Sequence, residues 1–178
     1  MFKIKIYFKK IKIGVLVFLL VLTGLILINS MLELGKINKS IVIDASPKEV
    51  FSFTGDWKNL PEYQKGIENW QPTTENTRGE GAKFSYTTNE LGIEFDIETK
   101  IVDVTLNEER VWRTVSGADI EAKYLFEPQN GRTKTTYILD YNLPIPIIGN
   151  ILDVLLVRES RELWVENTLQ NLKKLIEE

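Results

Sequence analysis

The chain has 178 residues, enough for one ordinary domain and an appendage. It contains neither cysteine nor histidine, which excludes disulfides, thiolate nucleophiles, Cys/His zinc sites and catalytic triads built on histidine. Residues 1–12 carry five lysines and no acid, and in the rest of the chain 17 basic side chains face 25 acidic ones, a net charge of −8. An acidic domain repels phosphate backbones, so we expect no nucleic-acid partner.

An uncharged apolar run follows the lysines and covers Ile13–Ile28. Extended to Leu34, it is long enough for a membrane helix, which needs about 20 residues. Lysines that precede such a helix tend to stay in the cytoplasm, so we expect a single-pass cell-membrane protein with an extracytoplasmic C-terminal domain. The expected divisions are a basic cytoplasmic N-terminus at 1–12, a transmembrane signal anchor at 13–34, a tether at 35–39 and a domain at 40–178.

Two other interpretations of the apolar run stay open. A cleaved signal peptide has the same charged start, although Ile28-Asn29-Ser30-Met31 is a poor cleavage site because it lacks small residues at the right spacing. A buried core helix would show one polar face, and this run shows none.

The domain opens with a strand at Ser40–Asp44, followed by the sequence ASPKEVFSFTGDWKNLPEY, which indicates two short helices. Ser46 can cap the first, with Pro47 at the first helical position and Glu49 three residues after the cap. Asp56 can cap the next turn. Helices this short are not stable alone in water, so they must pack against a larger element.

Alternation with period two dominates after residue 66 and predicts strands. In Ile93–Ile101 the apolar side chains point one way and the charged ones point the other, which is typical of a sheet with one buried face. Hairpin turns are expected at Asn89–Gly92 and at Gln129-Asn130-Gly131. With the first strand, short connections predict seven antiparallel strands, the other six being within Ile67–Thr77 and at Ala82–Thr88, Ile93–Ile101, Glu109–Val115, Ile120–Glu127 and Thr133–Leu143.

Helical spacing of apolar residues begins at Ile148 and continues for nearly thirty residues, which predicts one long C-terminal helix. This helix can cover the apolar face of the sheet, and the fold class is therefore α+β. The segment Leu143–Val157 is more apolar than a surface helix requires. It is either buried core or an apolar rim that touches lipid.

The order of these elements resembles the SRPBCC superfamily of START-like, helix-grip domains, which includes polyketide cyclase/dehydrase-like proteins. The resemblance covers about residues 38–177, and the ordered set of features is fairly specific for the fold. The features are the strand Ser40–Asp44, Ser46-Pro47 with Glu49 and Val50-Phe51, Asp56-Trp57 before Leu60-Pro61, the strand meander, and a closing helix with Leu172-Lys173-Lys174-Leu175. The resemblance implies a curved seven-stranded antiparallel sheet wrapped on the long helix, with an elongated cavity for a lipid, sterol, quinone or polyketide-like molecule.

The inward strand positions are rich in aromatic residues, which supply apolar area and, in tyrosine, a polar tip. We expect a ligand pocket among them, and the alternative is that they simply fill a core. The candidate pocket residues are Phe84, Tyr86, Phe95, Ile97, Arg113, Tyr124, Phe126, Tyr137, Tyr141, Leu152 and Leu156.

Three arginines have ambiguous positions. Arg113 points inward if Val111 faces in, where it can bind a carboxylate or phosphate, and points to solvent if Trp112 faces in. Arg158 and Arg161 interrupt the apolar face of the long helix. They either pair with neighbouring glutamates in solvent or form a polar gate at the pocket mouth.

Catalysis would need a general acid or base inside the pocket. Most carboxylates, including Asp140, fall on the polar strand face, and no pair forms a catalytic dyad, so we assign no catalytic residue, metal site or cofactor. The favoured function is a membrane-tethered binder or carrier of a hydrophobic small molecule. The alternatives are a cyclase/dehydratase that uses Tyr86, Tyr137 or Tyr141 as an acid, and a protein-interaction module without a ligand.

Overall fold

The structure is a computed structural model that describes residues 14–15, 18–21, 23–24, 35–90, 93–142 and 157–178. The chain divides into two compact units, Met1–Leu34 and Gly35–Glu178. Within the described residues, no helix is both long and apolar enough to span a bilayer. Most of the expected anchor at 13–34 lies outside the described residues, so the anchor stays a prediction.

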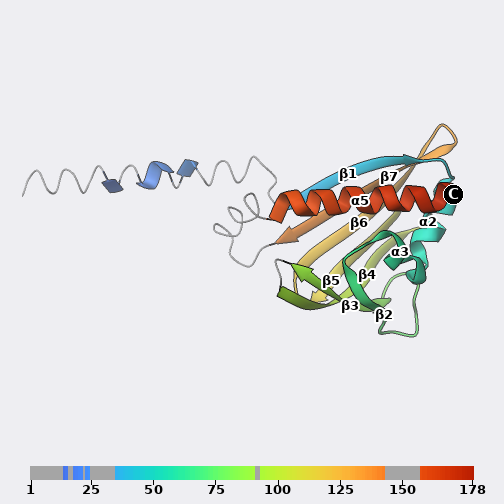
Figure 1. The fold of residues 1–178 in the computed structure, drawn as a ribbon, viewed down its shortest axis with the longest axis horizontal. Helices are drawn as coiled ribbons and strands as arrows, with labels where there is room; N and C mark the ends of the chain where they lie inside the picture. The colour runs from blue at the N-terminus through green and yellow to red at the C-terminus, as the bar shows by residue number, and fades with distance from the viewer. Residues whose placement is uncertain (1–13, 16–17, 22, 25–34, 91–92, 143–156) are drawn as a thin grey trace, which may run out of the picture. The chain divides into compact units, whose positions relative to one another are not determined.

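The described part of the second unit forms a seven-stranded sheet in which every neighbouring pair is antiparallel, as predicted. Its strand order is β1-β7-β6-β5-β4-β3-β2, so the first strand closes against the last (Figure 1). The strands are β1 Lys36–Ile43, β2 Ile67–Pro72, β3 Lys83–Glu90, β4 Ile93–Thr105, β5 Glu109–Ser116, β6 Asp119–Gln129 and β7 Arg132–Asn142.

The connections between strands explain this meander. Asn130 and Gly131 join β6 to β7 with φ angles of 52° and 80°. Two consecutive positive φ values match the right-handed twist of a tight hairpin, and Asn-Gly adopts them at little cost. The pairing of β3 with β4 extends further than expected, because Glu90, placed in the predicted loop at Asn89–Gly92, pairs with Ile93.

Three short helical segments leave β1 and cover one end of the sheet: α2 Pro47–Gly55, η1 Trp57–Asn59 and α3 Leu60–Tyr63. The predicted capping box is present at α2, since the Glu49 amide donates to the Ser46 hydroxyl at 3.4 Å and the Ser46 amide donates to the Glu49 carboxylate at 2.8 Å. The Ser46 hydroxyl and amide lower the pKa of Glu49. Phe51 then anchors α2 to the sheet by an edge contact with Phe126, ring centroids 5.6 Å apart.

The long helix α5, Arg158–Glu177, lies across the concave face beside β1 and β7 (Figure 1). Its buried side carries Val165, Thr168, Leu169 and Leu172. Near its C-terminal end, Lys173 donates to the Val42 carbonyl at 2.6 Å. The predicted helix starts at Ile148, but residues 143–156 lie outside the described part, so its first turns are untested.

The hydrophobic core of the second unit lies between the sheet, α2, α3 and α5, and all of its members fall between Ile37 and Ile176. We therefore expect residues 35–178 to fold without the N-terminal segment. One boundary is corrected: β1 begins at Lys36 and pairs with β7 along its whole length. Residues 36–39 thus belong to the sheet and do not form a tether.

Candidate functional site

A cavity of about 730 Å³ lies between the concave face of the sheet, α3 and α5. Three successive inward rows of side chains line it, because directly paired residues on β5, β6 and β7 point to the same face. On β6 the three rows contain Tyr124, Ala122 and Ile120. Consecutive rows are two residues, or roughly 6.6 Å, apart along the strand. The cavity therefore runs parallel to the strands, from the short helices toward the β5–β6 hairpin.

The inner end of the cavity is polar but closed. Tyr124 and Tyr137 face each other across β6 and β7 with ring centroids 4.4 Å apart, and both are almost fully buried. Gln64, which follows α3, donates from Nε2 to the Tyr124 hydroxyl at 3.1 Å. Burial raises the pKa of both phenols, so they stay protonated and keep a proton that can be donated to a ligand.

The middle of the cavity is apolar. Trp112, Ala122 and Leu139 lie side by side on β5, β6 and β7. Trp112 packs edge-on against Tyr124 with centroids 5.8 Å apart. Because alanine stands between two large side chains, the row leaves space above it for an apolar ligand.

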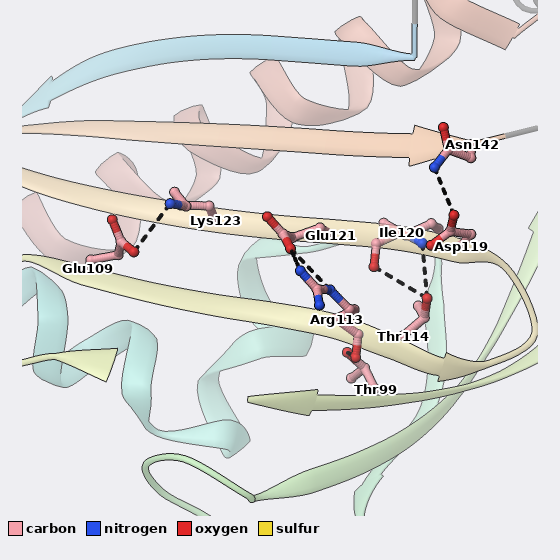
Figure 2. Close-up of polar contacts among 9 residues, drawn as sticks. All are labelled: Thr99, Glu109, Arg113, Thr114, Asp119, Ile120, Glu121, Lys123 and Asn142. Carbon is pink, nitrogen blue, oxygen red and sulfur yellow. Dashed lines mark hydrogen bonds and ion pairs between the residues drawn. The ribbon is translucent and has the colours of Figure 1, made fainter. Parts of the chain in front are cut away.

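The outer end opens between the β5–β6 hairpin, the end of β7 and the start of α5. Tyr141 faces Ile120 here, and the guanidinium of Arg161 lies 4.0 Å from the centre of the Tyr141 ring. Figure 2 shows how the hairpin is held: the Ile120 amide donates to the Thr114 hydroxyl at 2.9 Å. These contacts give the mouth a defined polar rim.

Comparison with known proteins identifies the family. The family model described as "Polyketide cyclase / dehydrase and lipid transport" matches residues 35–177. This chain belongs to that family. A search of curated proteins finds no match.

Solved structures share the fold of this family member at low sequence identity. TTHA0849 from Thermus thermophilus is 21% identical with a TM-score of 0.68, over 79% of this chain and 96% of that one. The ZhuI aromatase/cyclase from Streptomyces sp. R1128 is 9% identical with a TM-score of 0.66, over 80% and 93%. A START superfamily protein from Mycobacterium smegmatis is 16% identical with a TM-score of 0.60, over 79% and 98%. These similarities show the fold, as the resemblance implied.

Six of the expected pocket residues line the cavity: Tyr86, Phe95, Ile97, Tyr124, Tyr137 and Tyr141. Phe84 and Phe126 do not, because they fill the core instead. Phe84 stacks on Trp70 with centroids 4.7 Å apart, and Phe126 lies between Tyr124 and the helix α2. Leu152 and Leu156 lie outside the described residues.

The pocket assignment of Arg113 is wrong. Trp112 and Thr114 face the cavity, so Arg113 points to the outer face and forms an ion pair with Glu121 (Figure 2). Its side chain is 58% exposed. Arg158 pairs with Glu162 at 3.0 Å, the solvated alternative, whereas Arg161 lines the mouth of the cavity.

The sequence analysis missed the inward arginine, Arg110, which is only 5% exposed. Its guanidinium lies 4.2 Å from the centre of the Phe51 ring and donates to the Thr54 hydroxyl at 3.2 Å. Burial lowers the pKa of Arg110 to about 10. Arg110 lies two residues before Trp112 and so shares its face, but the sequence left open which face of β5 points inward.

Gln64 and Trp164 were also missed, because both positions depend on packing between distant segments. Trp164 of α5 donates from its indole to the Lys65 carbonyl at 2.6 Å and so closes one side of the cavity. Local sequence patterns around Gln64 give no indication that its side chain turns into the sheet.

Proposed function

We propose that this chain is a membrane-tethered binding or carrier domain for a hydrophobic or amphipathic small molecule such as a lipid, quinone, sterol or polyketide-like compound. The observation that carries the proposal is the cavity of about 730 Å³ with its aromatic and aliphatic walls. Small-molecule sites are typically pockets of roughly 300–1,000 Å³ with apolar walls and a few placed polar groups.

The apolar middle of the cavity supplies favourable free energy for binding a ligand. Burying a methylene group contributes about 0.8 kcal/mol, so eight buried methylenes give roughly 6 kcal/mol before the entropic cost of association. Trp112 and Leu139 offer the surface for this burial. A ligand of this kind needs no ionic contact.

The proposed membrane anchor rests on the uncharged run Ile13–Ile28, which follows five lysines. We expect the full-length protein to resist extraction from membranes by high salt or alkaline carbonate, with the domain on the extracytoplasmic side. Release by salt, or a mature N-terminus beyond residue 28, would show that the anchor is absent. A protease added outside the cell should digest the domain if it lies on the extracytoplasmic side of the membrane.

The binding proposal is tested with residues 35–178, which contain the whole described core. After gentle purification, native mass spectrometry should detect a bound apolar molecule, and organic extraction should identify it. A folded, delipidated domain that takes up none of a broad panel of lipids, quinones and aromatic polyketides would contradict the proposal and favour an interaction module.

The same panel tests for catalysis, since the family description includes cyclases and dehydrases. Of the described residues that line the cavity, Asp119 at the mouth is the one carboxylate, and it accepts a 2.7 Å hydrogen bond from Asn142 (Figure 2). Conversion of any panel member would show that the chain is an enzyme.

A further inference from the structure

Hydrogen-bond donors gather at the inner end of the cavity. The Tyr63 hydroxyl is buried, and within the described part of the chain it has no hydrogen-bond partner. The Tyr124 hydroxyl accepts a bond from Gln64, so its own proton still needs an acceptor. Tyr137 lies against Tyr124 and interacts with the same Gln64 side chain. Tyr63 does not itself line the cavity, so two phenols and one amide meet at its inner end.

The surroundings of these donors are electropositive. Arg110 lies directly opposite Tyr124 on β5, is buried, and forms no ion pair with an acid among the described residues. The nearest candidate counter-charge on the cavity wall, Asp119, is five residues along β6 from Tyr124, roughly 16 Å away. Burial also keeps Tyr124 and Tyr137 protonated by raising the pKa of each phenol. Among the described residues that line the inner end, no carboxylate is present to accept the phenol protons.

We propose that the inner end of the cavity is a subsite for a carbonyl oxygen, which the ligand carries at its leading end as a ketone or a carboxylate. The oxygen accepts from Tyr137 and Tyr124, and the apolar body of the ligand lies along the row of Trp112, Ala122 and Leu139. This subsite deepens the proposed binding function and rests on it.

The physical reason is the cost of buried donors without acceptors. A hydrocarbon that fills the cavity displaces water from the phenols and leaves their protons unpaired, whereas a carbonyl oxygen replaces that water. One net hydrogen bond at this end corresponds to a roughly three- to tenfold difference in affinity.

The test compares ten-carbon probes that differ in the leading group: 2-decanone, decanoate and decane. Full-length protein is reconstituted in nanodiscs, and uptake is measured for the wild type and for Tyr137→Phe, which removes one donor. Partition into lipid is the same for both proteins and cancels in the comparison. The matched control is Thr136→Val, which removes a hydroxyl from the neighbouring residue on the opposite face, where it contacts Ser40 at 2.9 Å.

We expect Tyr137→Phe to weaken binding of 2-decanone or decanoate about three- to tenfold and to leave decane unchanged, with no such selectivity in Thr136→Val. A larger loss for 2-decanone would indicate that the ligand carries a neutral ketone, and a larger loss for decanoate would indicate an ionised carboxylate. Equal losses for decane and the oxygenated probes would overturn the subsite while leaving the binding function intact. If no probe binds the wild type, the proposed function itself fails.

Infrared spectroscopy gives a second measurement, which reports the hydrogen bond to the ligand directly. A purely structural role of Tyr137 would not change it. The carbonyl band of ¹³C-labelled 2-decanone should shift to lower frequency when bound to the wild type, and part of that shift should disappear in Tyr137→Phe. A bound band at the frequency found in hydrocarbon solvent would show that no donor reaches the ketone, and would refute the subsite.

Discussion

Raising the pH above 10 should destabilise the domain steeply, because its buried phenols cannot ionise in place. Burial raises the pKa of Tyr63, Tyr124 and Tyr137 in the folded state, so each contributes stability that is complete below the ordinary tyrosine pKa of about 10 and is lost above it. Arg110 acts in the opposite direction: its lowered pKa of about 10 makes the folded state release a proton that the unfolded state still keeps.

The magnitude follows from the proton balance. Between about pH 10.5 and 12, the unfolded state has lost three phenol protons that the folded state retains, and it still holds one guanidinium proton that the folded state has lost. Over one and a half pH units, a net difference of two protons corresponds to a loss of about 4 kcal/mol, close to the whole free energy of unfolding of a marginal domain.

Urea unfolding of residues 35–178 between pH 9 and 12, followed by tryptophan fluorescence, measures this slope. Two variants change the slope in opposite directions: Tyr137→Phe should halve it, and Arg110→Met should make it about one and a half times as steep. Phenolate absorbance, recorded in parallel, should rise for the buried tyrosines only as the protein unfolds. If all five tyrosines of residues 35–178 ionise near pH 10 while the fluorescence stays native, or if neither variant changes the slope, the buried phenols are not the cause.

Two further substitutions test the packing around the site. Gly55→Ala places a Cβ atom 2.5 Å from Nη2 of Arg110, so it should destabilise the domain by roughly 1–3 kcal/mol in urea unfolding, whereas helical Gly→Ala changes normally stabilise. If the displaced guanidinium is the cause, Arg110→Met should remove the penalty, and a penalty that persists would contradict the explanation. Ala122→Phe should fill the middle of the cavity and reduce ligand uptake at least tenfold without loss of stability; Arg113→Leu, on the outer face, is its control and should leave uptake unchanged.

Much of the fold was predictable because its signals are local. The capping box at Ser46 and Glu49, the Asn130-Gly131 turn and the two-residue alternation of the strands each depend on neighbours in sequence. The inward positions Tyr124 and Tyr137 followed from the same alternation. Around Arg113 the alternation allowed either face of β5 to point inward. The packing of Trp112 against Tyr124 is what turns Trp112 inward and Arg113 outward.

The polar chemistry of the inner end was not predictable, because it depends on contacts between segments far apart in the chain. Gln64 meets Tyr124 across 60 residues, and Arg110 meets Thr54 across 56. Once packing turns Trp112 inward, the alternation of β5 places Arg110 on the same face, but it does not indicate a buried position without an acidic partner. Such a residue is rare in a core because an isolated charge is costly to desolvate.

The two short helices explain how that charge is held and connect local sequence to the ligand end of the cavity. The capping box starts α2 at a fixed residue, which places the Phe51 carbonyl and the Thr54 hydroxyl near the C-terminal end of the helix, where the partial charge is negative. The Arg110 guanidinium donates to these two groups and lies over the Phe51 ring. In the sheet, Arg110 of β5 is the register partner of Tyr124 on β6. Gln64, which directly follows α3, donates a hydrogen bond from its side-chain amide to the Tyr124 hydroxyl. The helices therefore do more than close one end of the sheet, since they supply the groups that orient the donors at the inner end.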